Sequence, residues 1–299
     1  MQIHGVIPVI PTPFRPDDGI DEESLRRTVD FAIAGGACAI CAPAFGSEYY
    51  KLDDAERRQI VEIVAGQTAG RVPVFASASA GSVASTVEFS RHAESCGAQG
   101  IMIAPPRAVP LGAHELTSFF EAVCGSIKIP VMLQDADFAS SGLSVDFFME
   151  AAKRSPNLKF LKLENVLPGE RCREILRRSQ GQLQVLYGWG GLRLFDGLAH
   201  GATGVMPGTG LVDIYVRIIR LYEQGRVTES KALFYRLLPF LVFAVEHLEL
   251  FIRMEKRVLM KRGVIASDRL REPTLHLDDL YEEQMEELVD LGIRLAQEP

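Results

Sequence analysis

Lys162 and Glu164 lie two positions apart in a short apolar run, residues 158–164. Side chains alternate between the two faces of a strand, so this spacing predicts that both charged groups share one face with Phe160. Burying an amine and a carboxylate costs free energy unless both are used. Burial lowers the pKa of a lysine, and the neutral amine can then attack a carbonyl carbon. The run therefore predicts either a nucleophilic amine or a structural Lys–Glu pair at a strand end.

The elements that would position this lysine are eight short apolar runs at fairly even intervals. Amphipathic stretches with helix-start signals separate them, and such an alternation is typical of a parallel sheet. The apolar runs are residues 6–10, 37–42, 72–76, 100–104, 130–133, 159–163, 183–186 and 203–206. The predicted helices begin near residues 21 and 53 and cover residues 82–95, 112–123, 144–153 and 211–222.

Eight strand–helix units predict an α/β fold, a (β/α)8 TIM barrel over residues 1–225. The alternative is a doubly wound open sheet, which favours a Gly-rich turn after the first strand, whereas the chain has Pro-Thr-Pro-Phe at 11–14. No strand run follows in residues 226–299, and the stretches 228–262 and 277–296 are helical in pattern. We expect this segment to form a C-terminal helical extension packed on the barrel.

In a TIM barrel, reactive groups project from the carboxyl ends of the strands. Lys162 and Glu164 should therefore meet the polar and aromatic residues that follow the other strands. We expect Tyr187, Trp189 and Met206 to line the wall of the shared mouth. The residues that follow strands two, five, seven and eight are Gly46, Ser47, Gln134, Asp135, Tyr187, Trp189 and Met206.

The sequence gives less support to other kinds of functional site at the mouth of the barrel. Gly46 and Ser47 could offer amides and a hydroxyl to a substrate carboxylate, or form a plain turn. The Gly-rich residues 188–191 and 208–210 leave a phosphate site open. No histidine follows a strand, so we expect neither a metal site nor a Ser-His-Asp triad there. Lys162 is therefore the strongest candidate for the reactive side chain.

Composition limits the classes of partner. The chain has 299 residues, 47% hydrophobic and 24% charged, which is typical of a soluble globular protein. Its net charge of −7 argues against nucleic acid or an anionic membrane as main partner. No apolar run approaches the ~18 residues of a membrane span, and the N-terminus lacks signal-peptide features. Five scattered cysteines, including a CxxC at Cys38 and Cys41 inside an apolar run, indicate buried thiols and a cytoplasmic location.

Five motifs occur in an order that is found in a known enzyme family. They are residues 12–14, Gly46-Ser47-Glu48 with Leu52 and Glu56, Lys162 on the sixth strand, residues 201–205, and the pattern Lys256, Leu259, Gly263 and Ile265. Together they resemble the dihydrodipicolinate synthase / N-acetylneuraminate lyase family over essentially the whole chain. The resemblance implies a barrel with C-terminal helices, a Schiff-base lysine at Lys162, a small 2-keto acid substrate, no cofactor, and a homotetramer or dimer.

The chain departs from the family's synthase members at several positions. Their Gly-Thr-Thr-Gly loop is replaced by Ala-Phe-Gly-Ser at residues 44–47, and their tyrosine and asparagine on strand five by Gln134 and Asp135. Their substrate-gripping arginine falls near Ala139, and the tyrosine lent across their dimer interface falls near Arg107. These replacements disfavour dihydrodipicolinate synthase activity.

Gln134, Lys162 and Glu164 together resemble the branch that contains L-2-keto-3-deoxyarabonate dehydratase. In that branch glutamine takes the place of the tyrosine, and the acid after the lysine is the base. The resemblance implies a metal-independent lyase that forms a Schiff base and dehydrates a 2-keto-3-deoxy sugar acid. A pyruvate-dependent aldolase, the synthase itself, and a non-catalytic or phosphate-binding barrel stay open.

Overall fold

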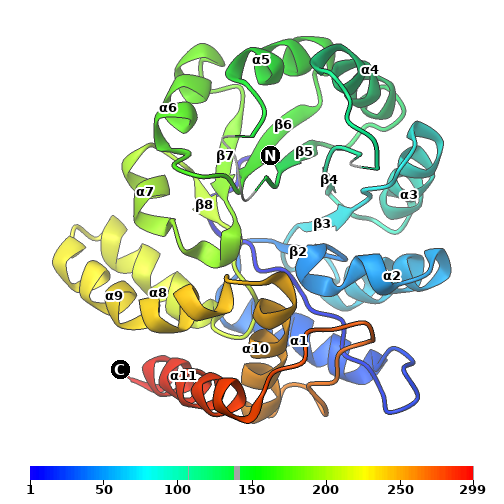
Figure 1. The fold of residues 1–299 in the computed structure, drawn as a ribbon. Coiled ribbons are helices and arrows are strands. Elements are labelled where there is room, and N and C mark those ends of the chain that lie inside the picture. Colours follow the sequence, from blue (N-terminus) through cyan, green and yellow to red (C-terminus); the bar gives the residue numbers. More distant parts are fainter. Residues whose placement is uncertain (107, 138–141, 299) are drawn as a thin grey trace.

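The computed structural model describes residues 1–106, 108–137 and 142–298, and eight parallel strands in them form one sheet. From β2 to β8 each strand pairs with the next one along the chain, and β8 pairs with β1. Val9 bridges Cys41 on one side and Gly208 on the other, so the sheet closes on itself. The predicted TIM barrel is confirmed (Figure 1). The strands are β1 (Gly5–Val6), β2 (Ile40–Ala42), β3 (Val74–Ser77), β4 (Gly100–Ile103), β5 (Val131–Asp135), β6 (Leu158–Leu163), β7 (Gln184–Tyr187) and β8 (Gly204–Val205).

One helix follows each strand and covers the outside of the barrel (Figure 1). Asp21, Asp53, Ser82 and Ser144 cap four of these helices, because their side chains accept a backbone N–H from the first turn. The sequence predicted six helices but not α6 and α7, which are short and bury few residues. The helices are α1 (Glu22–Ala34), α2 (Asp54–Thr68), α3 (Val83–Ser95), α4 (Ala113–Cys124), α5 (Val145–Arg154), α6 (Gly169–Arg178), α7 (Leu194–Ala199) and α8 (Val212–Glu223).

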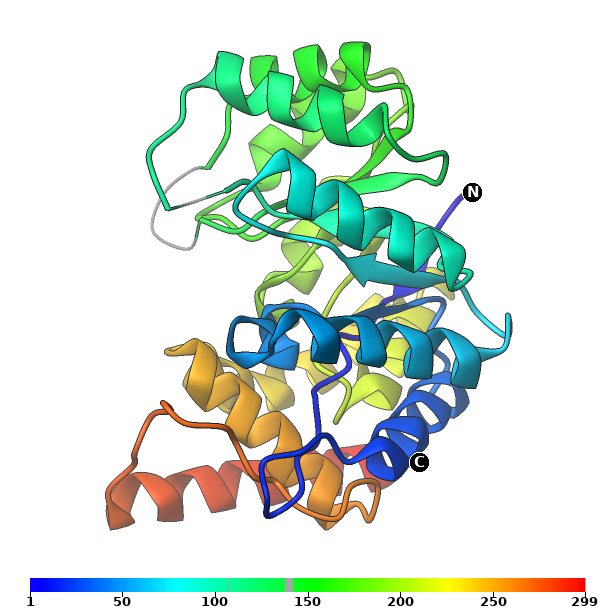
Figure 2. The same cartoon turned by 90° about the vertical axis from the view of Figure 1, so that its right-hand side faces the viewer.

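Three further helices, α9 (Val227–Ala244), α10 (Leu248–Lys261) and α11 (Asp279–Gln297), lie against the side of the barrel next to α8 and α1 (Figures 1 and 2). The sequence predicted that residues 228–262 are helical and gave no break, whereas the structure divides them between α9 and α10. His247 begins α10 by accepting the amide of Glu249 at 3.1 Å. In the described part of the chain, every helix is too short or too polar to cross a membrane.

Strand alternation divides the core into two layers. Phe160 of β6 points into the barrel, where its ring meets Phe75 edge to face with the centroids 5.3 Å apart. Leu161 and Leu163 point outward and pack under the helices. The inner layer therefore continues upward from Phe160 to the next inward position on β6, which is Lys162.

Candidate active site

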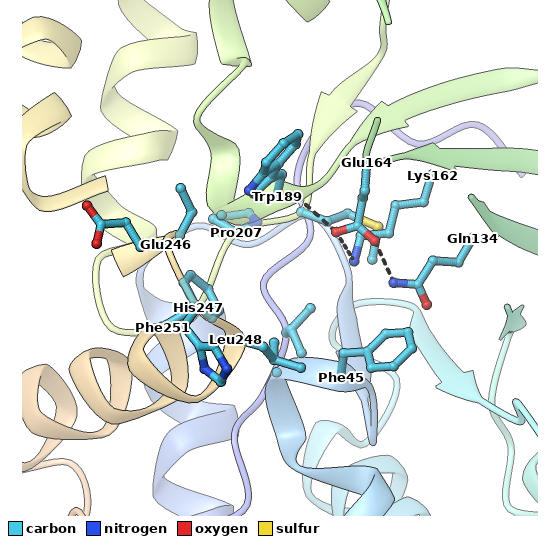
Figure 3. A pocket seen from close by; sticks show the side chains of 15 residues that line it. Phe45, Gln134, Lys162, Glu164, Trp189, Pro207, Glu246, His247, Leu248 and Phe251 are labelled. Carbon is cyan, nitrogen blue, oxygen red and sulfur yellow. Dashed lines mark hydrogen bonds and ion pairs between the residues drawn. The ribbon is translucent and has the colours of Figure 1, made fainter. Parts of the chain in front are cut away.

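A cavity of about 380 Å³ opens above the inner layer, at the carboxyl ends of the strands. Figure 3 shows the groups from β5 and β6 on one side and the connection between α9 and α10 on the other. The strands and their loops contribute Val9, Phe45, Gly46, Gln134, Lys162, Glu164, Trp189, Gly190, Met206 and Pro207 to its lining. The C-terminal segment contributes Val245, Glu246, His247, Leu248 and Phe251.

Lys162 is placed by the register of three neighbouring strands. It lies opposite Gln134 on β5 and Leu186 on β7. Its side chain is only 5% exposed, and its Nζ lies 3.1 Å from Oε1 of Glu164. Among the described residues, Glu164 is the one carboxylate paired with this amine. The predicted pair thus exists, and both of its members line the cavity.

Glu164 is fixed at both carboxylate oxygens. Its Oε2 accepts a hydrogen bond from Nε2 of Gln134 at 2.6 Å. Its Oε1 accepts the backbone N–H of Trp189 at 2.9 Å and faces Lys162. The side chain is 6% exposed, so these partners replace the water that a carboxylate needs. All three residues predicted as catalytic are therefore in direct contact (Figure 3).

Gly188 makes room for this carboxylate. A Cβ atom at Gly188 would lie 2.1 Å from Oε1 of Glu164 and 2.5 Å from its Cγ. The carboxylate of Glu164 can therefore take this position only because residue 188 has no side chain. The chain then turns through Trp189 and Gly190, both at positive φ, and brings the Trp189 amide over Glu164.

Ser47 does not reach the cavity, which corrects the expectation that its hydroxyl binds substrate. Its Oγ accepts the amide of Ala44 at 2.9 Å and donates to the carbonyl of Ile10. Its own amide donates to the carbonyl of Ala44 at 2.9 Å, which closes the short η1 turn (Phe45–Ser47). Gly46, by contrast, does line the cavity as expected.

Tyr187 also lies outside the cavity, and this is a second correction. Leu186 points into the barrel opposite Lys162, so its neighbour Tyr187 points outward under α7. A Cβ at Gly197 of α7 would lie 3.0 Å from the Tyr187 ring, which shows how closely the two pack. Burial raises the pKa of the Tyr187 hydroxyl far above its usual range. Trp189 and Met206 line the cavity as predicted.

The sequence did not predict that the C-terminal segment lines the cavity. Leu248 and Phe251 add apolar surface, and Glu246 adds the second carboxylate of the lining. These residues surround the break between α9 and α10, where no glycine or proline marks a turn. The nearest signal in the sequence was Lys256, which belonged to the family pattern and lies further along α10.

Lys256 docks α10 onto the loop after β2. Its Nζ is fully buried and ion-pairs with Oε1 of Glu48, which is equally buried. The other Glu48 oxygen meets Nζ of Lys51 at 3.1 Å and the amide of Arg271 at 3.2 Å. Burial lowers the pKa of Lys256 to about 8. Glu56 of the same motif pairs with Arg271, so the predicted second-loop signature holds the C-terminal segment in place.

A third carboxylate lies beneath the loop after β8. Glu255 of α10 is buried, and its Oε2 accepts the amide of Gly210 at 2.7 Å. A Cβ at Gly208 would lie 2.0 Å from its Cδ, so that glycine is needed for close contact. Burial raises the pKa of Glu255 to about 7. The loop that carries Met206 is thus held from below by α10.

Asp135, the neighbour of Gln134, turns away from the cavity. It pairs with Arg171 at 3.1 Å and accepts the amide of Leu143. Burial raises its pKa to about 6, against the opposing effect of Arg171. Ala139 and Arg107, the predicted counterparts of two synthase residues, lie outside the described residues.

Comparisons with known proteins identify the same family that the sequence motifs resemble. Residues 2–291 match the dihydrodipicolinate synthetase family. An L-2-keto-3-deoxyarabonate dehydratase of Azospirillum brasilense is 30% identical over 97% of this chain and 94% of its own. A 4-hydroxy-tetrahydrodipicolinate synthase of Pelobacter propionicus is 27% identical over 78% and 80%. The crystal structure of dihydrodipicolinate synthase from Rhodopseudomonas palustris superimposes with a TM-score of 0.88 at 26% identity, over 96% and 97% of the two chains.

Proposed function

The chain belongs to the dihydrodipicolinate synthetase family, and we propose that it is a lyase that dehydrates a 2-keto-3-deoxy sugar acid through a Schiff base on Lys162. One observation carries the proposal: the Lys162 amine and the Glu164 carboxylate lie 3.1 Å apart in the wall of the cavity. The similarity to the dehydratase from Azospirillum brasilense over nearly the full length of both chains supports the choice of reaction.

The first step is addition of the Lys162 amine to the 2-keto carbon. An amine attacks only when it is neutral, and Oε1 of Glu164 is close enough to take its extra proton. The carbonyl oxygen then leaves as water, and a protonated imine forms. Because the surrounding side chains exclude most solvent, little water competes for the imine.

The protonated imine makes a C3 proton removable, because it accepts the electron pair that the C–H bond leaves behind. Glu164 takes this proton, and the pair forms the C2–C3 double bond of an enamine. The enamine then expels the C4 hydroxyl, which leaves as water with the proton that Glu164 returns. Hydrolysis of the remaining imine frees the product and restores Lys162.

Gln134 and the Trp189 amide act by orienting Glu164, since they hold its two oxygens at 2.6 and 2.9 Å. The substrate carboxylate, which is attached to the reacting carbon, needs hydrogen-bond donors of its own. With Ser47 bonded elsewhere, we assign this role to the backbone amide of Gly46 in the cavity wall. Trp189 and Met206 would contact the carbon chain.

A phosphate-binding barrel finds less support. Gly188 lies against Glu164, and Gly208 and Gly210 lie against Glu255. A phosphate in either loop would face a carboxylate, which repels it. We further propose a homotetramer or dimer in the cytoplasm, on the family resemblance and on the free state of all five cysteines.

Borohydride reduction tests the lysine. The protein is incubated with pyruvate or 2-keto-3-deoxy-L-arabonate, reduced and weighed by mass spectrometry. We expect one adduct on wild type and on Lys159→Ala, a matched lysine on the same strand, and none on Lys162→Ala. An adduct that persists in Lys162→Ala would refute the assignment. Glu164→Gln should keep the adduct and lose turnover.

Product analysis tests the reaction. Dehydration releases a keto acid with the full carbon chain, whereas an aldolase would release pyruvate and an aldehyde. Condensation of pyruvate with aspartate semialdehyde would instead indicate the synthase. We expect only the keto acid with the full carbon chain, and we expect its rate of formation to fall when Glu164 is replaced.

A further inference from the structure

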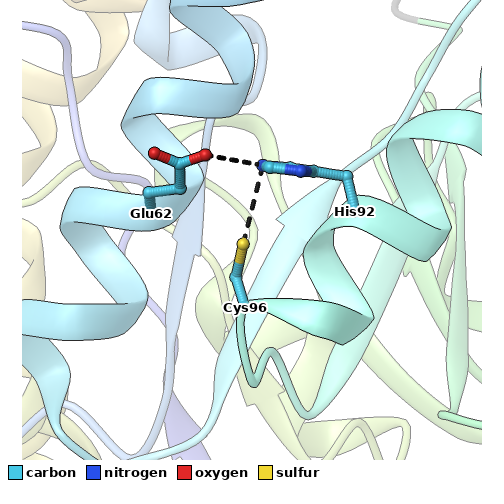
Figure 4. A group of neighbouring side chains, drawn as sticks. All are labelled: Glu62, His92 and Cys96. Atoms are coloured by element: carbon cyan, nitrogen blue, oxygen red, sulfur yellow. Dashed lines mark hydrogen bonds and ion pairs between the residues drawn. The ribbon is translucent and has the colours of Figure 1, made fainter.

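A second group of reactive side chains lies on the outside of the barrel, away from the cavity. Glu62 projects from α2, His92 projects from the last turn of α3, and Cys96 directly follows α3, four residues after His92. Oε1 of Glu62 lies 3.4 Å from Nε2 of His92, and Sγ of Cys96 lies 3.5 Å from the same nitrogen. Figure 4 shows the three groups turned toward one another.

Hydrogen bonding serves the two contacts of this histidine poorly, because Nε2 holds at most one proton. If Nε2 of His92 carries a proton, it can donate to Glu62 but cannot accept from the Cys96 thiol. If Nε2 is unprotonated, it can accept from Cys96 but has nothing to donate to Glu62. In the unprotonated tautomer, Nε2 and the Glu62 carboxylate direct lone pairs toward each other, and in the protonated tautomer the sulfur can only share, as a weak acceptor, the proton that Nε2 donates to Glu62. A cation placed among them would accept a lone pair from each of the three groups.

The spacing fits a tetrahedral ion. Zinc binds nitrogen and oxygen at about 2.0–2.2 Å and thiolate sulfur at about 2.3 Å, so neighbouring ligand atoms lie about 3.4–3.6 Å apart. Nε2 of His92 lies 3.4 Å from Oε1 of Glu62 and 3.5 Å from Sγ of Cys96, and all three ligand atoms lie within 4.8 Å of one another. We propose that Glu62, His92 and Cys96 bind a divalent transition-metal ion, with Zn²⁺ preferred.

The donor set selects the class of metal. A carboxylate, an imidazole and a thiolate suit Zn²⁺ and its neighbours, whereas Mg²⁺ and Ca²⁺ require oxygen ligands. The Glu62 side chain is 58% exposed, so an ion reaches the site from solvent and keeps water in the fourth position. A cysteine binds a metal ion as the thiolate, so binding at Cys96 would release a proton.

The site is structural rather than catalytic, because none of its three residues lines the cavity. The ion would join α2 to α3, which face each other in the outer layer of the barrel. Metal binding should therefore raise the melting temperature and leave turnover unchanged. This inference is independent of the proposed lyase reaction.

Cobalt titration of the full-length, chelator-treated and reduced protein tests the site. Tetrahedral Co²⁺ bound to a thiolate gives visible d–d bands and a near-ultraviolet charge-transfer band, and Zn²⁺ should displace it at one equivalent. Cys96→Ser should abolish the charge-transfer band, and His92→Gln and Glu62→Gln should each weaken Zn²⁺ binding by about tenfold or more. Cys38→Ser, which changes a half-buried thiol elsewhere, serves as the matched control.

Each outcome of these experiments either supports the proposed metal site or overturns it. Absence of saturable 1:1 binding to wild type overturns the proposal, and so does a charge-transfer band that survives Cys96→Ser. A band lost equally in Cys38→Ser would place the thiolate elsewhere and also overturn it. Melting temperatures without metal establish that each variant is folded, and a Zn²⁺-dependent rise in wild type but not in Cys96→Ser supports the site.

Discussion

Gly188→Ala should displace the proposed base, Glu164, without changing that residue itself. The new methyl group would lie 2.1 Å from Oε1 of Glu164, whereas a carbon and an oxygen need about 3.2 Å. The carboxylate must therefore withdraw by about 1 Å, which breaks its bond to the Gln134 amide or to the Trp189 amide.

A displacement of about 1 Å in a catalytic group costs about 100-fold in rate, equivalent to about 2.7 kcal/mol of barrier. We therefore expect kcat for dehydration to fall by about that factor in Gly188→Ala, while pyruvate and borohydride still modify Lys162. Steady-state kinetics and adduct mass together measure the two effects. Gly66→Ala is the control, because its Cβ meets nothing within 4 Å on α2.

A Gly188→Ala enzyme with wild-type turnover would refute the role assigned to the position of Glu164. Loss of the lysine adduct along with turnover would also contradict it, because the change would then act on Lys162 or on the fold. The control should keep full activity and gain about 0.5–1 kcal/mol of stability, since alanine is favoured over glycine in a helix.

Three further changes test the surrounding structure. Ser47→Ala should lower the free energy of unfolding by about 1–3 kcal/mol in urea titrations and leave kcat unchanged, because the buried hydroxyl bonds only to backbone. Lys256→Met should cost about 3–5 kcal/mol by the same measurement, because it leaves Glu48 as a buried charge without its main partner. Burial raises the pKa of Glu255 to about 7, so the folded state holds a proton that the unfolded state releases near its ordinary pKa of 4.5. The stability from this group is complete below pH 4.5 and lost as pH rises through 7, and Glu255→Gln should flatten that slope in unfolding measured between pH 5 and pH 8.

Periodicity predicted the fold and the shared face of Lys162 and Glu164, and of the two misplaced residues only Ser47 depends on a contact that periodicity does not describe. Alternation placed Lys162 and Glu164 on the inner face, and it should also have placed Tyr187 outside, because Leu186 takes the inward position on β7. Ser47 was misplaced because its partner Ile10 lies 37 positions away. The domain division after residue 225 stays a prediction.

The break between α9 and α10 was not predictable from local signals, since residues 245–247 carry no glycine or proline. It exists because two contacts hold α10 against the barrel: Lys256 with Glu48, and Glu255 with the loop after β8. The break brings Glu246 and Phe251 to the cavity. The C-terminal extension is therefore part of the site, and its distance along the chain concealed this.

The glycines at the barrel mouth show why a Gly-rich loop is weak evidence for a phosphate. Such a loop indicates only that something approaches the backbone closely. At Gly188 the approaching group is the Glu164 carboxylate, and at Gly208 and Gly210 it is the Glu255 carboxylate. A ligand anion and a protein carboxylate accept the same backbone N–H groups, as Glu164 does from Trp189. The two loops therefore position acids of the protein itself, and one of those acids is the proposed base.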